Sequence, residues 1–359
     1  MSDGTPRSVL VACMKDEGPF VLEWIAYHKS IGFNDFIILT NDCTDGTDLI
    51  LDRLDDMGIV QHLPNPWVIG AGEKTLQSTA IEYAQLQKRF RLADWVFIAD
   101  ADEFLNIQIG NKDLPSLFGV IGDAQAISFN QVVFGNAGIQ EFVDAPVTMQ
   151  FFRRFDFSGD SPRLYPMMFG LKTLAHNRGD IYSRFTNHIP RLKKPIDPGL
   201  IWMDGGGKPV DPRFLNSQTR SYPVYMHRSK DPKTGKVQKT RKLYDAGGPT
   251  HDLGYVNHYA LKSLESFVVQ SRRGDAVNPE IRRDVSYWRS YDRNDVEDRT
   301  IVPQAERSRD LLEDFKKDPV LGPLHDIAVK RHREIYRKML KQNKVRNLIE
   351  ECLAAASGG

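Results

Sequence analysis

The sequence predicts an α/β fold in which a mostly parallel sheet carries a functional site at one edge. From Ser8 to about Asn106, apolar segments of strand length alternate with helical segments, which is the pattern of βαβ units. The apolar run 95–99 leads directly into Asp100-Ala101-Asp102. A buried strand that ends in two carboxylates delivers both to the carboxyl edge of a sheet, where open α/β folds bind ligands.

The elements of this N-terminal half follow one another closely. We expect strands at 9–13, 36–40, 59–63 and 93–99, and helices at 19–30, 48–57 and 73–90. The helix 19–30 ends before Gly32, a typical helix stop, and the polar loop 41–47 opens the next helix. The sequence contains neither G-x-G-x-x-G nor a P-loop motif, so it signals neither a Rossmann dinucleotide site nor a P-loop.

Beyond about residue 107 the periodicity weakens. Strands are expected at 126–134 and 147–155, and helices return at 261–273 and from 304 to the end. Residues 191–250 are rich in Pro, Gly and Lys and are expected to form long loops, which in compact domains usually bind substrate or move. Residues 301–359 are therefore expected to form a helical C-terminal extension.

Composition excludes several classes of protein. Lys and Arg number 48 against 47 Asp and Glu, and this balance argues against a nucleic-acid partner. Cys13, Cys43 and Cys352 are too scattered for a disulfide framework or a zinc cluster, which fits a reducing compartment. No apolar stretch approaches the roughly 20 residues that cross a bilayer. We expect a cytoplasmic protein, either free or bound to the inner face of the membrane.

The acidic pair has a specific chemistry. Mg²⁺ and Mn²⁺ prefer oxygen ligands, and their sites usually take one or two carboxylates from the protein and leave the other positions to water and substrate phosphates. Asp100 and Asp102 therefore predict a clamp for a divalent cation and a diphosphate. The alternative is a loop whose acids cap a helix or are merely solvated.

Several ordered motifs resemble one family. These motifs are Lys15–His28, Gly32-Phe33, Asn41–Thr47, Asp100–Phe104, Val133–Gly138, Leu171–Thr173, Asn257–Ser263 and Arg272–Gly274. With them the chain resembles glycosyltransferase family 2-like proteins, and most of all a subgroup that also resembles eukaryotic family 92 enzymes. The resemblance covers about residues 8–275.

The resemblance implies a GT-A fold, that is, a mixed, mostly parallel central sheet flanked by helices. One domain, 1–300, would combine a nucleotide-binding half, 8–106, with an acceptor-binding half, 107–300, ahead of the extension 301–359. Proteins of this type transfer a sugar from a nucleoside-diphosphate sugar, here favouring UDP, to a hydroxyl of a glycan or lipid-linked acceptor, typically with inversion. Mn²⁺ or Mg²⁺ would neutralise the departing diphosphate. The alternative is a non-catalytic nucleotide- or glycan-binding protein of the same fold.

The resemblance also assigns residues. The metal set is Asp102 as direct ligand, Asp100, which would serve the ribose or the metal through water, and His258. The nucleotide-sugar set is Glu17, Asn41, Asp42, Lys74, Asp100, Ala101, Lys262, Arg272 and Arg273. Glu17 has an alternative role as a cap of the helix that starts near Pro19, and Lys74 as a solvated helix lysine.

An inverting transfer needs a base within hydrogen-bond reach of the acceptor hydroxyl. Glu141, His188, Asp204 and Asp252 qualify by location. Asp252 leads because it lies shortly before His258 in a Gly-rich stretch.

Two segments are locally basic. Residues 228–242 hold seven basic residues and one acid, and are expected to form a flexible surface loop that either steers an anionic acceptor or is simply solvated. Lys330–Arg346 holds eight basic residues and one acid, Glu334. It is expected to form a basic amphipathic helix that either lies on an anionic membrane surface or is solvated and packed by one narrow stripe.

Overall fold

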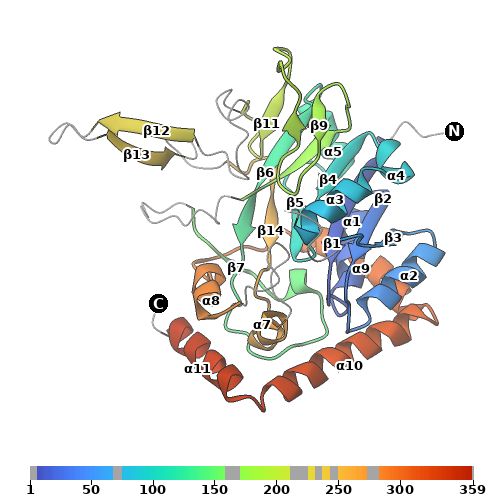
Figure 1. The fold of residues 1–359 in the computed structure, drawn as a ribbon, viewed down its shortest axis with the longest axis vertical. Coiled ribbons are helices and arrows are strands. Elements are labelled where there is room, and N and C mark those ends of the chain that lie inside the picture. Colours follow the sequence, from blue (N-terminus) through green and yellow to red (C-terminus); the bar gives the residue numbers. More distant parts are fainter. Residues whose placement is uncertain are drawn as a thin grey trace.

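The computed structural model describes residues 6–67, 75–157, 170–210, 225–230, 237–242, 250–272 and 283–357. The first part of the chain forms β1 (Ser8–Met14), α1 (Val21–Ser30), β2 (Asp35–Thr40), α2 (Thr47–Asp56), β3 (Gln61–Pro64), α3 (Leu76–Ala84), α4 (Lys88–Arg91), β4 (Trp95–Ile98), β5 (Glu103–Ile107), α5 (Leu114–Ile121) and β6 (Ala126–Val133). Figure 1 shows the strands gathered into one sheet, with the helices packed around it.

The second part begins with a 3₁₀ turn (Val147–Met149) and continues through short strands to the C-terminal helices. Its strands are β7 (Arg153–Arg154), β8 (Leu171–His176), β9 (Tyr182–Arg184), β10 (Arg191–Leu192), β11 (Trp202–Asp204), β12 (Tyr225–Lys230), β13 (Val237–Lys242), β14 (Gly254–His258) and β15 (Val296–Glu297). Its helices are α7 (Leu264–Ser271), α8 (Val285–Tyr291), α9 (Val302–Lys317), α10 (Leu321–Met339) and α11 (Asn343–Ser357).

The central sheet has the order β3-β2-β1-β4-β8-β6-β14-β5, with β11 paired to β6. β3, β2, β1 and β4 are mutually parallel, and β14 and β11 run parallel to β6. β8 and β5 are antiparallel to their neighbours. The predicted α/β class, with a mixed, mostly parallel sheet flanked by helices, is confirmed.

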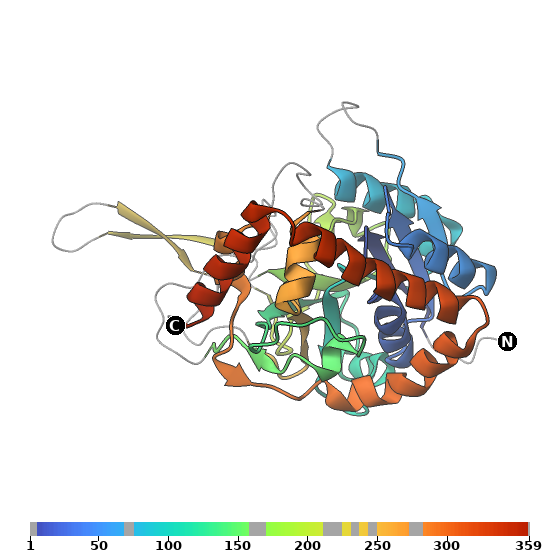
Figure 2. The same cartoon turned by 90° about the horizontal axis from the view of Figure 1, so that it is seen from below.

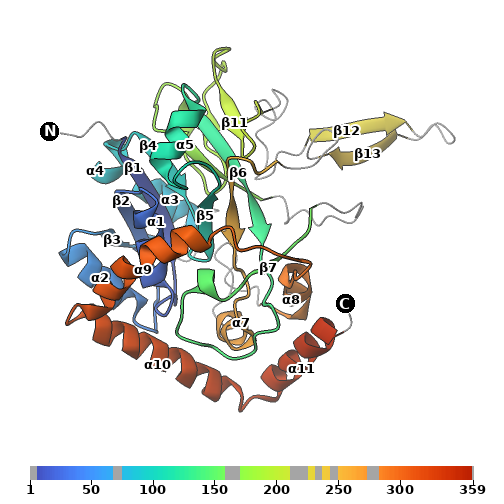
Figure 3. The same cartoon turned by 180° about the vertical axis from the view of Figure 1, so that it is seen from behind.

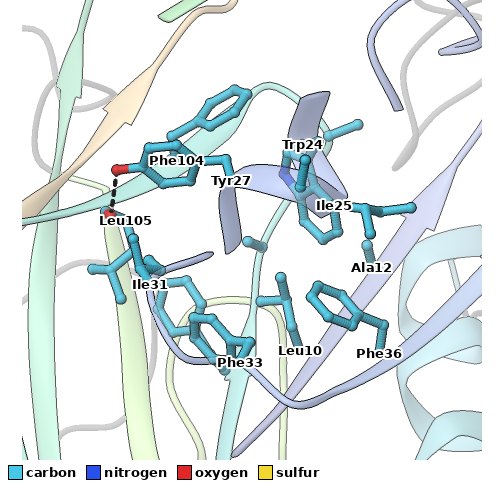
Figure 4. Close-up of a cluster of buried hydrophobic side chains, with 14 of the residues drawn as sticks. Leu10, Ala12, Trp24, Ile25, Tyr27, Ile31, Phe33, Phe36, Phe104 and Leu105 are labelled. Carbon is cyan, nitrogen blue, oxygen red and sulfur yellow. Dashed lines mark hydrogen bonds between the residues drawn. The ribbon is translucent and has the colours of Figure 1, made fainter. Parts of the chain in front are cut away.

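Side-chain alternation along the strands divides the core into two layers. Leu10 and Ala12 of β1 pack on the α1 side of the sheet, whereas Val9 and Val11 pack with Ala80 and its neighbours in α3. Figure 4 shows the first layer, where Trp24 and Phe36 pack near Leu10 and Ala12 of β1. In the same view, the Tyr27 hydroxyl donates a hydrogen bond to the Leu105 carbonyl at 3.0 Å and ties α1 to β5.

The C-terminal extension is helical, as predicted, and it packs against the N-terminal half. α9 lies against α1, and α10 contacts α2, α7 and α9. Figure 2 shows α10 and α11 running across one face of the molecule. Ala328 of α10 lies so close to Gly18 that a Cβ on Gly18 would come within 2.7 Å of the Ala328 Cβ. The turn between β1 and α1 therefore rests directly on α10.

Three expected elements differ. The helix expected at 73–90 is two helices, α3 and α4. The strand expected at 147–155 contains only the 3₁₀ turn and the two-residue β7, because the Glu23 carboxylate accepts hydrogen bonds from the backbone N–H groups of Val147 (2.7 Å) and Thr148 (3.0 Å). A loop is expected over the basic segment 228–242. Its described residues, 228–230 and 237–242, instead lie in the antiparallel strands β12 and β13, which project from the body in Figures 1 and 3.

No helix in the described parts of the chain combines the length and the apolar character that spanning a bilayer requires.

Candidate active site

The turn between β4 and β5, which contains Asp100 and Asp102 and is called the acidic turn, is held in place by hydrogen bonds from α1. The indole Nε1 of Trp24 donates hydrogen bonds to the carbonyl oxygens of Asp100 (3.1 Å) and Glu103 (3.0 Å). Trp24 is fully buried, and α1 is buried along most of its length, including the polar residue His28. The position of the two aspartates is therefore set by a packed helix rather than by a free loop.

Asp102 and His258 face each other across this turn. β14 pairs with both β5 and β6, and this places its last residue, His258, beside Glu103 and Val133. His258 Nε2 lies 3.7 Å from Asp102 Oδ1. Burial lowers the pKa of His258, although the charges of Asp102 and Asp100 oppose the shift. The ring is therefore neutral near pH 7. Its Nδ1 is buried and has no hydrogen-bond partner among the described residues.

Both carboxylate oxygens of Asp100 accept hydrogen bonds from neighbouring side chains. Its Oδ1 accepts a hydrogen bond from Gln77 Nε2 at 2.6 Å, and its Oδ2 accepts one from Lys172 Nζ at 3.0 Å. Lys172 has no exposed side-chain surface, and its ammonium also lies 2.9 Å from Glu103 Oε2 and 2.7 Å from Asn187 Oδ1. Burial alone would lower the pKa of Lys172, but the charges of Asp100 and Glu103 and the hydrogen bonds to them outweigh it and raise that pKa. The lysine stays charged.

Glu103 completes this buried cluster. Its side chain is fully buried, and Gln131 Nε2 donates a hydrogen bond to Oε1. Burial raises the pKa of Glu103, and the nearby charge of Lys172 opposes that rise. The role of Lys172 was missed at the level of sequence, although Leu171–Thr173 is one of the motifs of the resemblance. The available signal was a lysine between the apolar residues Leu171 and Leu174 of a strand.

The loops that follow β1 and β2 contain the predicted nucleotide residues Glu17, Asn41 and Asp42. They lie side by side because the two strands are parallel neighbours. Asp42 has a left-handed backbone (φ 47°) and a side chain that is 79% exposed, 3.8 Å from Lys15 Nζ. Glu17 is buried, and its backbone carbonyl accepts hydrogen bonds at the start of α1. The N-cap residue of α1 is Phe20, which makes no side-chain capping hydrogen bond.

Asp45 and Arg272 fasten these loops. The Asp45 carboxylate accepts hydrogen bonds from the backbone N–H groups of Gly18 (2.8 Å) and Thr47 (2.9 Å), which joins the two loops. Arg272, at the end of α7, donates to Thr44 Oγ1 at 2.9 Å and lies 3.5 Å from Asp16 Oδ2.

The remaining predicted nucleotide residues fall into three groups. Ala101 is buried within the acidic turn, and Asn41 is half-buried beside Asp42. Lys262 is buried, with Nζ 4.7 Å from the centre of the Phe20 ring. Lys74 and Arg273 lie outside the described residues.

The candidate bases do not come together at the turn. Five residues of mostly extended chain lie between Asp252 and His258 and span about 15–20 Å, so Asp252 lies towards the opposite edge of the sheet. Glu141 is exposed on a loop. The Asp204 carboxylate accepts hydrogen bonds from the backbone N–H groups of Gly206 and Lys208, both at 2.9 Å.

His188 is the candidate that lies near the acidic turn. Its Nδ1 lies 3.0 Å from the Leu171 carbonyl, and this oxygen can only accept, so Nδ1 carries the proton. Burial, and next the charge of Lys172, lower the pKa of His188 to about 4. The imidazole is neutral near pH 7 and is a weak base.

Comparisons with known proteins agree with the resemblance. The family model of glycosyltransferase family 92 matches residues 10–160. A family 92 protein of Ricinus communis is 30% identical over 108 residues, which are 29% of this chain and 18% of that protein. One of Oryza sativa subsp. japonica is 29% identical over 106 residues, 29% and 17% of the two chains. The matched region thus spans less than a fifth of either relative.

A crystal structure of residues 1–349 of TarS from S. aureus aligns at 9% identity and a TM-score of 0.28, over 48% of this chain and 47% of that chain. The acidic turn of this chain lies at the carboxyl edge of its sheet, directly after β4. The resemblance to family 92 is confirmed for residues 10–160, which include β1, β2 and the acidic turn.

Proposed function

We propose that the protein is a metal-dependent glycosyltransferase that moves a sugar from a nucleoside-diphosphate sugar, with UDP as the favoured nucleotide, to a hydroxyl of a glycan or lipid-linked acceptor. The observation that carries the proposal is the pair Asp102 and His258, 3.7 Å apart, at the edge of the sheet where β1 and β2 also end. Asp102 lies within the segment that is similar to family 92, and His258 pairs with residues of that segment, which supports the reaction class.

The residues fit a divalent cation. A carboxylate oxygen and a neutral imidazole nitrogen are both ligands that Mn²⁺ accepts. The described residues contain no cluster of three or more potential metal-ligating side chains, so water and the diphosphate would supply the other positions. When bound, the cation would neutralise the negative charge that develops on the diphosphate.

The chain's own residues would orient the nucleotide. The exposed carboxylate of Asp42 can accept hydrogen bonds from ribose hydroxyls or base N–H groups. Arg272 and Asp45 hold the two loops that frame this position. The proposal assigns no base, because among Glu141, His188, Asp204 and Asp252 only the weakly basic His188 lies near the turn.

The proposal is tested by calorimetric titration with UDP and GDP, with and without Mn²⁺. We expect UDP to bind when Mn²⁺ is present and to bind at least about tenfold more weakly without it, because the cation offsets the repulsion between the diphosphate and the acidic turn. Binding of neither nucleotide would contradict the proposal. Binding without any release of UDP from a panel of UDP-sugars and glycan acceptors would favour the non-catalytic alternative.

We further propose a peripheral membrane contact through the exposed face of α10. At 100° per residue, the buried residues Ala328, His332 and Met339 fall on one side of this helix. The opposite side is exposed and predominantly basic; its basic residues are Lys330, Arg331, Arg333, Arg337 and Lys338. Figure 2 shows that α10 lies on the outside of the molecule. A surface of this charge is complementary to anionic lipid headgroups.

Sedimentation with vesicles tests this contact. Replacing Arg337 and Lys338 by Glu is expected to weaken binding to vesicles of equal parts phosphatidylserine and phosphatidylcholine by more than about tenfold, since each basic residue contributes roughly 1 kcal/mol. The matched control replaces the exposed residues Lys88 and Arg91 of α4 by Glu, which changes the net charge equally. Equal loss in both variants, or equal binding of the unmodified protein to pure phosphatidylcholine, would refute a specific membrane face.

A further inference from the structure

We propose that Lys172 is the positioning residue of the acidic turn: it fixes Asp100 for contact with the nucleotide and leaves Asp102 as the carboxylate that receives the cation. This inference rests on the proposed function and adds a residue to it. Neither the motif around Lys172 nor the family match gives the lysine a role.

Lys172 reaches the turn because of the strand order. β8 runs antiparallel between β4 and β6, so its first residues, unlike those of its neighbours, lie at the edge where β4 and β6 end. Lys172 is the second residue of β8 and pairs with Phe129 of β6. The reversed strand β8 thus brings the positively charged side chain of Lys172 to an edge that otherwise presents the acids Asp100, Asp102 and Glu103.

The ammonium of Lys172 is fully used within the protein. It carries three donors, and three acceptors surround it: Asp100 Oδ2 at 3.0 Å, Glu103 Oε2 at 2.9 Å and Asn187 Oδ1 at 2.7 Å. Its side chain has no exposed surface. Lys172 therefore has no donor to offer a phosphate, and it acts on the nucleotide only through Asp100.

The two aspartates have different neighbours. Both carboxylate oxygens of Asp100 already accept hydrogen bonds, one from Lys172 and one from Gln77. The carboxylate of Asp102 faces His258 instead. Lys172 also offsets the repulsion among three carboxylates that lie within four consecutive residues, one of which, Glu103, is fully buried.

The experiment separates positioning from simple charge compensation. Lys172→Met alone would leave Glu103 buried without its cation and would unfold the protein readily. The double variant Lys172→Met with Glu103→Gln removes one charge of each sign. It therefore keeps the net charge of the cluster and releases Asp100. A second variant, Gln77→Ala, removes the other hydrogen bond to Asp100 from a half-buried position.

We measure the thermal midpoint, the affinity for Mn²⁺ alone, and the affinity for UDP in the presence of Mn²⁺. The double variant is expected to keep a midpoint near that of the unmodified protein and to bind Mn²⁺ alone at least as tightly. Its UDP affinity is expected to fall by about tenfold or more, and that of Gln77→Ala by several fold, because Asp100 is no longer held. If Lys172 had only a structural role, the variant would not lose affinity for UDP while it kept its affinity for Mn²⁺.

Each other outcome has a defined meaning. If the unmodified protein binds UDP with Mn²⁺ and the folded double variant binds it equally well, Lys172 serves only to neutralise Glu103 and the inference is overturned. If the double variant does not fold, an unchanged UDP affinity of Gln77→Ala overturns it. If the unmodified protein binds neither UDP nor GDP, the proposed function itself fails and this inference falls with it.

Discussion

Replacement of Asp102 by Asn is expected to lower the Mn²⁺-dependent affinity for UDP by about 100-fold or more, the upper end of what disturbing a metal site usually costs. Asn has the same shape, so the change removes a charge and leaves the packing intact. The backbone carbonyl of residue 102 keeps its hydrogen bond from the Tyr259 N–H, at 2.8 Å in the unmodified protein. The thermal midpoint should therefore change little, and calorimetric titration reads out the loss.

A matched variant distinguishes this effect from a general loss of negative charge. Asp123 is exposed and lies before β6, at the opposite edge of the sheet. Asp123→Asn is expected to bind UDP as the unmodified protein does. If Asp102→Asn retained Mn²⁺-dependent binding, the cation would have to be held elsewhere, and the assignment of the acidic turn would be wrong.

Replacement of Trp24 by Ala is expected to destabilise the protein by about 3–5 kcal/mol, the usual range for removing a buried aromatic side chain. Trp24 is fully buried between α1 and the sheet, as Figure 4 shows, and its ring packs against those of His28 and Phe36. The change leaves a cavity and also removes the hydrogen bonds to the acidic turn. Urea unfolding measures the loss.

Trp24→Phe separates packing from hydrogen bonding. Phe retains most of the apolar contact but lacks the N–H donor, so a smaller cost of about 1–3 kcal/mol is expected. Because that donor holds the carbonyls of Asp100 and Glu103, the variant should also bind UDP more weakly in the presence of Mn²⁺ although it is folded. Unchanged UDP affinity would show that the acidic turn keeps its position without the indole.

Local pattern predicted the N-terminal half well. The strands before Asp16, Asn41 and Asp100 follow from apolar runs bounded by polar turns, and parallel pairing then brings their ends to one edge. The proximity of His258 to Asp102 came from the family resemblance rather than from periodicity, because nothing local indicates which strand pairs with β5. The structure brings that pair together as expected.

What local pattern could not predict depends on strand direction. Asp252 was favoured as a base because it is close to His258 in sequence, yet extended chain and β14 separate the two residues and place them towards opposite edges. Lys172 was given no role because its contact with Asp100 requires β8 to be reversed between β4 and β6. For Asp252, closeness in sequence did not mean closeness in space. For Lys172, the contact depends on the strand order of the sheet, which the sequence alone does not give.

The packing of the last helices against the first turn also bears on how the chain folds during synthesis. β1, α1 and β2 are synthesised before α9 and α10, and N-terminal regions generally begin to fold first. Yet α1 is covered by α9, and the turn that contains Gly18 rests on Ala328 of α10. The face of α1 that α9 covers therefore stays exposed until α9 has been made, and α9 follows every strand of the central sheet in the sequence. The nascent protein is expected to depend on chaperones over this interval, and the loop that contains Gly18 to take its final shape only after α10 has been made.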